Sequence, residues 1–461
     1  MGQFSRIALT TLALASCKPT VPPQWITQIE PEFAGANCAD GGLVIHEGPD
    51  IDADGVLDEG ERERASYQCA GELPDEYDGL FLGSIVVRTA DDVDALAQYD
   101  GLTGHLSIVG PQLGAVTIPG LRAIGGAVRV GSRDETTVLS SASFPDLAWA
   151  GGGVELTQNP SLTEFSAPLL EAQGDLVSIR LVDNPLLTDL SSLDGLTAIG
   201  DLEITGEQAT SVTLNSIAAA TGTLLLQPSG DDMQVSLPAA TVLGDVLIEG
   251  ESALTSFSAP LAETVLGSLV VADAPQLVEL STASVRTIGG NFDLLHADGL
   301  SAADFPVLEQ VDLRIKIQDN HVQTLDFPLL SSVGEGFWVS RNDALHSVDL
   351  SSLILVGNWP VLPFAIEANP VLTDLVLSPD ELLVDGWMVV ASNPMLPSLD
   401  PFMNVSGVTG DLTLKNNTLI SVCDSQALVD SIGTDNIGTA FDGVAFNEHV
   451  GVIDLGGEVC P

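Results

Sequence analysis

A repeat of about 23.5 residues runs through most of this 461-residue chain and limits the folds open to it. Each unit opens with Gly, a polar residue and two alternating apolar residues, as in Gly104-His-Leu-Ser-Ile108, Gly200-Asp-Leu-Glu-Ile204 and Gly410-Asp-Leu-Thr-Leu414. The first and last of these segments are separated by about thirteen steps of the repeat. A unit this short cannot bury its apolar face alone, so successive units must stack on one another.

The pattern inside each unit is that of β-strands. Apolar residues alternate with a period of two, and Gly, Asn and Pro punctuate the turns. No segment of the repeat has ten or more residues at helical spacing. We therefore expect three short strands per coil in an all-β, right-handed parallel β-solenoid over residues 84–422. Asparagines that recur after one strand are expected to stack at a corner of the coils: Asn159, Asn184, Asn320, Asn342, Asn369, Asn393 and Asn416.

The unit resembles the receptor L domain, the ligand-binding β-helical lobe of insulin- and growth-factor-type receptors, and bacterial lipoproteins also carry such repeats. The shared motif is Ile-Gly-x-Leu-x-Ile, then Asn-x-x-Leu-x-x-Leu, then Pro-x-Leu, over about residues 84–460. It consists of core and turn residues, so the resemblance implies the fold and transfers no functional residue. A leucine-rich-repeat horseshoe is the alternative, because its repeat length and asparagine are similar.

One outward position of the repeat gives a row of side chains one coil apart. The row contains Arg129, Glu155, Arg180 and Glu203, which predicts a ladder of alternating charge on the surface. Three of the five tryptophans, Trp338, Trp359 and Trp387, fall within residues 334–390, beside Phe337 and Phe364. Exposed aromatic rings on a rigid sheet suit stacking on sugars or peptides, whereas most large aromatic residues fill a core. Both interpretations stay open for these residues.

The N-terminus predicts export. Arg6 precedes a short apolar run, Ile7 to Ala15, which is too short to span a bilayer and indicates a signal peptide over residues 1–17. The ending Leu14-Ala15-Ser16-Cys17 resembles the bacterial lipobox, which implies lipidation of Cys17 and a membrane anchor. Residues 18–37 are then expected to form an extended tether. This assigns the protein to the exported bacterial lipoproteins, at the outer membrane or cell surface.

The remaining four cysteines form two local couples at opposite ends of the chain. Of the three possible pairings we favour Cys38–Cys69 and Cys423–Cys460, which suits an oxidising exterior. The first would close a small module over residues 38–80. The second would staple a C-terminal cap over residues 423–461, where a short helix from Ser425 to Ile432 is expected to cover the last coil.

A twelve-residue segment from Asp50 to Glu61 has the spacing of a calcium loop. Oxygen ligands are expected from Asp50, Asp52, Asp54, Val56 (through its carbonyl), Asp58 and Glu61, with Gly55 at the sharp turn. The preceding Gly41-Gly42-Leu43-Val44-Ile45 favours a strand rather than the entering helix of an EF-hand. The segment resembles a calcium-loop module at the front of secreted bacterial proteins, which implies that Ca²⁺ stiffens the joint between tether and body.

Charge and motifs limit the function. With 14 Lys and Arg against 64 Asp and Glu, the formal charge is −50, which excludes nucleic acid as a partner. The six histidines have no paired spacing, and hydrolase and phosphate-loop motifs are missing from the sequence. We therefore expect a non-enzymatic surface module for recognition or adhesion that binds an extracellular protein or glycan. The alternatives are a structural envelope protein and a β-helical polysaccharide-active enzyme.

Overall fold

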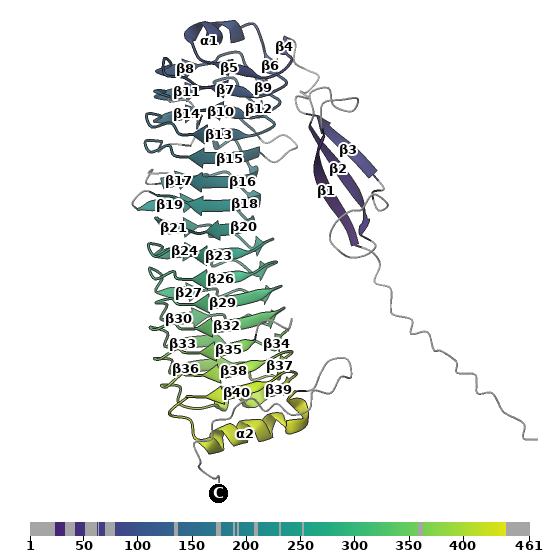
Figure 1. The fold of residues 1–461 in the computed structure, drawn as a ribbon, viewed down its shortest axis with the longest axis vertical. Helices are drawn as coiled ribbons and strands as arrows, with labels where there is room; N and C mark the ends of the chain where they lie inside the picture. Colours follow the sequence, from purple (N-terminus) through teal and green to yellow (C-terminus); the bar gives the residue numbers. More distant parts are fainter. Residues whose placement is uncertain are drawn as a thin grey trace, which may run out of the picture. The chain divides into compact units, whose positions relative to one another are not determined.

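A computed structural model of the chain describes residues 24–32, 42–50, 62, 64–69, 79–132, 137–171, 177–187, 190, 193–206, 211–229, 232–250, 253–357 and 363–438. The chain divides into two compact units, residues 1–72 and 73–461. Each unit is described here by itself (Figure 1).

The first unit contains a three-stranded antiparallel sheet in the order β1-β2-β3. Its strands are β1 (Gln24–Glu32), β2 (Gly42–Asp50) and β3 (Arg64–Cys69). β2 pairs with β1 on one side and with β3 on the other. β1 lies within residues 18–37, so residues 24–32 of the expected tether are part of a sheet instead.

The second unit is a parallel β-solenoid, as the repeat predicts, with three strands in most coils (Figure 1). The longest sheet, here called the main sheet, contains β5 (Ile85–Val87), β7 (Leu106–Ile108), β10 (Val128–Val130), β13 (Val154–Thr157), β15 (Val177–Val182), β16 (Ala198–Thr205), β18 (Ala219–Gln227), β20 (Val242–Ile248), β23 (Leu269–Ala272), β26 (Phe292–Leu295), β29 (Arg314–Gln318), β32 (Gly336–Ser340), β35 (Phe364–Glu367), β38 (Met388–Ala391) and β40 (Leu412–Lys415).

Two further sets of short strands close each coil. The second sheet contains β4 (Leu80–Phe81), β6 (Gly101–Leu102), β9 (Ala123–Ile124), β12 (Trp149–Ala150), β22 (Thr264–Val265), β25 (Thr287–Ile288), β28 (Gln310–Val311), β31 (Ser332–Val333), β34 (Leu355–Val356), β37 (Leu382–Val384) and β39 (Val405–Val408). In the middle coils the second and main sheets join through the irregular strands β16, β18 and β20.

The third sheet is in three separate parts. It contains β8 (Ala115–Thr117), β11 (Ser141–Ser143), β14 (Glu164–Ser166), β17 (Ser211–Thr213), β19 (Met233–Ser236), β21 (Leu254–Ser258), β24 (Glu279–Ser281), β27 (Ala302–Asp304), β30 (Thr324–Asp326), β33 (Ser347–Leu350) and β36 (Asp374–Leu377). In the part of the solenoid that the structure describes, no helix recurs between the strands from coil to coil: a helix over residues 90–96 and a 3₁₀ segment over residues 400–404 each occur in a single coil. This excludes the leucine-rich-repeat horseshoe for that part of the chain.

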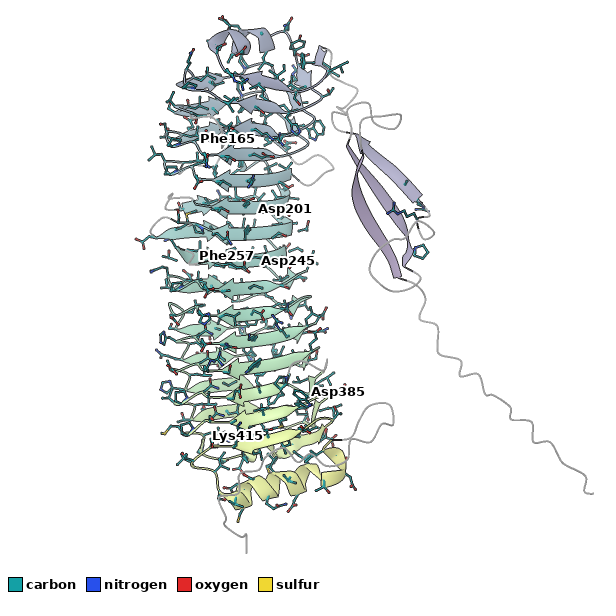
Figure 2. The ribbon with its side chains drawn as sticks, viewed as in Figure 1. Phe165, Asp201, Asp245, Phe257, Asp385 and Lys415 are labelled. Atoms are coloured by element: carbon teal, nitrogen blue, oxygen red, sulfur yellow. The ribbon has the colours of Figure 1, made fainter. Side chains whose placement is uncertain are left out.

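The core is a continuous apolar column inside the coils. Alternate residues of each strand point inward and are buried, as in Phe165 of β14 and Phe257 of β21 (Figure 2). Phe337 and Phe364 belong to this core, with ring centroids 5.7 Å apart, so the core interpretation is correct for both. Burial of about a hundred apolar side chains is the main stabilising contribution to the fold.

The Gly-Asp-Leu motif is explained by a contact between successive coils. The Oδ1 atom of Asp201 accepts a hydrogen bond from the backbone N–H of Thr223, and Asp245 accepts in the same way from Ser268 (2.8 and 2.6 Å; Figure 2). A Cβ atom on Gly222 or Gly267 would overlap these carboxylates. At these two positions glycine opens the unit because the aspartate of the preceding coil lies against it, whereas the glycine at position 410 meets the ring of Trp387 instead.

Stacked asparagines hold one corner of the coils, as predicted. Asn342 is fully buried; its Oδ1 accepts from the backbone N–H of Asn320, and its Nδ2 donates to the carbonyl of Ile317 (both 3.1 Å). Asn417, not Asn416, continues the ladder, because its Oδ1 accepts from the N–H of Asn393 (2.9 Å). The prediction of Asn416 is wrong by one residue.

Helices cover both ends of the stack (Figure 1). α1 (Ala90–Leu96) was not expected from the sequence; it is capped by Thr89 and buries Leu96. α2 (Val422–Ile432) agrees with the expected C-terminal helix and buries three apolar residues, Leu428, Val429 and Ile432. Two 3₁₀ segments, η2 (Asp400–Asn404) and η3 (Thr434–Asn436), lie against the last coils.

Candidate functional site

The proposed calcium loop falls almost entirely outside the described residues. Asp50 ends β2, whereas Asp52, Asp54, Val56, Asp58 and Glu61 lie in the segment that the structure does not describe. A strand, β2, enters the loop and another, β3, leaves it, which agrees with the expected departure from an EF-hand. Among the described residues, no group of three or more His, Cys, Asp or Glu could hold a metal ion. Calcium binding remains a prediction.

Most of the cysteines also lie outside the described residues. Cys17, Cys38 and Cys460 lie outside the described residues, and Cys69 is the last residue of β3. Cys423 in α2 is disulfide-bonded. The pairings Cys38–Cys69 and Cys423–Cys460 and the lipidation of Cys17 remain predictions.

The outward row on the main sheet is aligned as the sequence predicts. Residues in register on neighbouring paired strands run from Ser107 through Arg129, Glu155, Arg180, Glu203, Leu225, Leu247, Val270, Asp293, Lys316, Trp338, Ala365 and Val389 to Thr413. This row covers thirteen steps, and neighbouring strands of a sheet lie about 4.8 Å apart.

Five of the six charged side chains in this row form ion pairs; the sixth, Lys316, lies over the ring of Trp338. Arg129 binds Glu155 at 3.1 Å and Arg180 binds Glu203 at 2.6 Å, which are two pairs of the predicted ladder. Arg314, on the same sheet, donates two hydrogen bonds to the buried carboxylate of Asp293 (3.0 and 2.6 Å). These hydrogen bonds raise the pKa of Arg314. The main face thus presents neutralised pairs in a strongly acidic chain.

The three tryptophans differ in their surroundings. Trp338 is half-buried: its Nε1 donates to Glu367 at 3.1 Å, and the Nζ of Lys316 lies 5.3 Å from its ring centroid. These contacts occupy part of the ring, and ligand binding by the tryptophans stays a prediction. Trp387 is 50% exposed and lies against Gly410 of the next coil. Trp359 lies outside the described residues.

Three aspartates stack on the outer face of the third sheet. Asp326 in β30 is in register with Asp304 and with Asp349. Burial raises the pKa of Asp326, and the negative charges of Asp304 and Asp349 raise it further.

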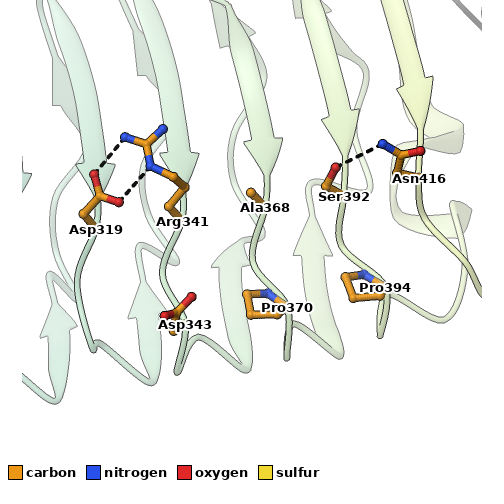
Figure 3. A pocket seen from close by; sticks show the side chains of 8 residues that line it. All are labelled: Asp319, Arg341, Asp343, Ala368, Pro370, Ser392, Pro394 and Asn416. Carbon is orange, nitrogen blue, oxygen red and sulfur yellow. Dashed lines mark hydrogen bonds and ion pairs between the residues drawn. The ribbon is translucent and has the colours of Figure 1, made fainter.

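Sequence reasoning missed a groove along one corner of the solenoid. It has a volume of about 540 Å³ and is lined by Asp319, Arg341, Asp343, Ala368, Pro370, Ser392, Pro394 and Asn416 (Figure 3). Here this set is called the corner groove. Asp319, Arg341, Ala368, Ser392 and Asn416 each have a positive φ of 54–57° and each directly precedes a ladder asparagine. Their side chains therefore stand in one column, coil after coil.

A second hollow of about 360 Å³ shares Asp319, Arg341 and Asp343 with the corner groove and adds His296, Asp298, Asn320 and His321. Arg341 donates two hydrogen bonds to Asp319 (2.7 and 2.8 Å), which lower the pKa of Asp319 to about 2. The Nδ1 atom of His296 lies 3.1 Å from Asp273, and that of His321 lies 3.3 Å from Asp298. The two hollows are therefore continuous along one corner of the solenoid.

The signal for this corner is present in the sequence but not in any local motif. His296 and His321 lie in successive coils, so the fold brings them into one hollow although they have no paired spacing. Aligning the residue before each ladder asparagine, and the residue after it, would have identified both columns.

The described part of the chain includes no helix long and apolar enough to cross a bilayer.

Two comparisons with known proteins found similar sequences. Residues 26–69 match a family model described as "Domain of unknown function (DUF7151)", which covers the three-stranded sheet and the proposed calcium loop. A curated protein, "Protein ecm33" of Aspergillus fumigatus, is 26% identical over 240 residues, 47% of this chain. The match spans about half of that relative's own length, 55%. No solved structure matches the chain.

Proposed function

We propose that this chain is a non-enzymatic protein displayed at the cell surface, where its solenoid holds a rigid recognition surface away from the membrane. The observation that carries the proposal is the unbroken register of the outward row across thirteen steps. Each coil is bonded to the next, and a continuous apolar core lies beneath the sheets, so side chains on the faces keep fixed positions relative to one another. Recognition of an extended ligand needs this kind of fixed array.

The chain's charge limits the ligands that such a surface would recognise. The formal charge of −50 favours neutral or cationic ligands over nucleic acid.

The attachment that we propose is a lipid on Cys17, which becomes the N-terminal residue after removal of residues 1–16, at a bacterial outer membrane. The signal-like apolar run and the lipobox-like ending support it. The DUF7151-like segment would then join the anchor to the solenoid, stiffened by Ca²⁺ on the Asp50–Glu61 loop and by Cys38–Cys69.

The experiment uses cells that produce the full chain. Surface biotinylation should label the intact protein, and a clickable fatty acid should label it in the wild type but not in Cys17→Ser. A wild-type protein that stays unlabelled by the impermeant biotin reagent would overturn surface display. Fatty-acid labelling that persists in Cys17→Ser would overturn the anchor alone.

A further inference from the structure

We propose that the corner groove binds a neutral oligosaccharide that lies along the solenoid axis. The inference rests on the proposed function, because it names the ligand class that a surface-displayed solenoid would recognise. The groove is distinct from the outward row on the main sheet, which the sequence analysis singled out.

The groove offers hydrogen-bonding groups suited to hydroxyls. Asp343 is exposed and, among the described residues, has no hydrogen-bond or ion-pair partner, so both oxygens can accept. The guanidinium of Arg341 uses two N–H groups on Asp319, and its remaining ones can donate. Ser392 and Asn416 add a hydroxyl and an amide at the far end (Figure 3). Donors and acceptors are thus present at both ends of the groove.

Between these polar groups lies an apolar surface. Ala368, Pro370 and Pro394 separate Asp343 from Asn416, and the two prolines stand in neighbouring coils (Figure 3). A sugar ring has polar edges and apolar C–H faces, so it can bond at its edge while its face rests on the prolines. Ligand sites generally combine apolar walls with a few placed polar groups in this way.

The charge of the groove favours a neutral ligand over a basic peptide. The charges of Asp319 and Arg341 cancel, which leaves Asp343 as the unpaired charge in the lining. Anionic ligands are repelled by the chain as a whole. A peptide also cannot add as a β-strand here, because the corner N–H groups already bond to the next coil, as Ala368 does to Ala391 (2.8 Å).

The spacing and stiffness suit a polymer of repeating units. From Asp319 to Asn416 the lining spans four steps, about 19 Å at the usual strand separation. Beneath it the buried ladder of Asn342, Asn369 and Asn393 fixes the corner backbone. The positions are therefore organised before a ligand arrives, which reduces the entropic cost of binding.

The test is isothermal titration calorimetry of the full chain with neutral hexasaccharides: cellohexaose, laminarihexaose and chitohexaose. We expect at least one to bind, and we expect Asp343→Ala and Arg341→Ala each to weaken that binding at least tenfold. Arg286→Ala is the matched control, because Arg286 is 53% exposed against 51% for Arg341 and also binds a carboxylate of the neighbouring coil, Glu309 at 2.6 Å. It should bind as the wild type does.

Three results would overturn the inference: no hexasaccharide binds, binding survives both groove variants, or Arg286→Ala weakens it equally. Binding of a lysine-rich peptide that is lost in Asp343→Ala, without saccharide binding, would reassign the groove to basic peptides. Surface biotinylation separates the two failures. A biotinylated protein that binds no hexasaccharide defeats only the groove inference, whereas an inaccessible protein defeats the proposed function.

Discussion

Replacement of Asn342 by alanine tests whether the asparagine ladder stabilises the corner. The side chain is fully buried. Its Oδ1 accepts from the backbone N–H and the Nδ2 of Asn320 (3.1 and 3.2 Å), and its Nδ2 donates to Ile317 and Asn369 (3.1 and 3.2 Å). The substitution removes these four hydrogen bonds and leaves the N–H of Asn320 without its acceptor.

The magnitude follows from these contacts. A buried donor left without a partner costs about 1–3 kcal/mol, and each further hydrogen bond contributes about 0.5–1.5 kcal/mol. We therefore expect Asn342→Ala to destabilise the surrounding coils by about 3 kcal/mol or more. Because 1.4 kcal/mol corresponds to a factor of ten, amide hydrogens of β29, β32 and β35 should exchange about 100-fold faster or more.

Hydrogen exchange read by mass spectrometry suits this measurement, since stacked repeats open locally. The matched control is Asn215→Ala. Asn215 is exposed, with hydrogen bonds to Asp194 at 3.2 Å, and its loss should change stability by less than about 0.5 kcal/mol. Equal exchange in the two variants would refute the stabilising role of the ladder.

Three more predictions concern other parts of the chain. Because the pKa of Asp326 is raised in the folded state, its ionisation opposes folding. The free energy of unfolding should therefore increase as pH falls through the raised pKa towards 3.8, and Asp326→Asn should remove this pH dependence in thermal unfolding. The Asp319 carboxylate has the opposite effect on the pH dependence of stability, because its pKa is lowered to about 2. Its contribution to stability is present above pH 3.8 and is lost as pH falls towards 2. Arg341→Met should return the pKa of Asp319, measured by NMR, towards 3.8. Gly410→Ala should displace Trp387, because a Cβ atom there overlaps its ring, and so change the tryptophan fluorescence, whereas Gly114→Ala, which meets open space, should leave it unchanged. An unchanged spectrum for Gly410→Ala would contradict this packing.

Much of the solenoid was predictable because each coil repeats one pattern. Alternating apolar residues fix which side chains point inward, so the outward row from Ser107 to Thr413 could be aligned without a structure. Asn416 was misassigned because two asparagines adjoin, and Asn416 takes the left-handed position while the half-buried Asn417 bonds to the ladder. α1 has only seven residues, too few to produce a recognisable helical period.

The corner groove could not be predicted by motif. Asp319, Arg341 and Asp343 meet because the coils stack, and their neighbours in space are about one coil away in sequence. What each contributes depends on its partner: Arg341 neutralises Asp319, whereas Asp343 stays free to bind within the described part of the chain. A sequence repeat shows which residues of successive coils are aligned in columns, but it does not show which of these columns lines a groove.

The coil-to-coil contacts also determine how such a molecule can change its height over evolutionary time. Since each coil contacts mainly its two neighbours, a duplication or loss of one whole unit leaves every remaining contact type intact. The distance between the two capping helices would then grow or shrink by about 4.8 Å at a time. The length of such a solenoid can therefore change only in steps of one coil, and the solenoids of its relatives should differ in length by whole coils.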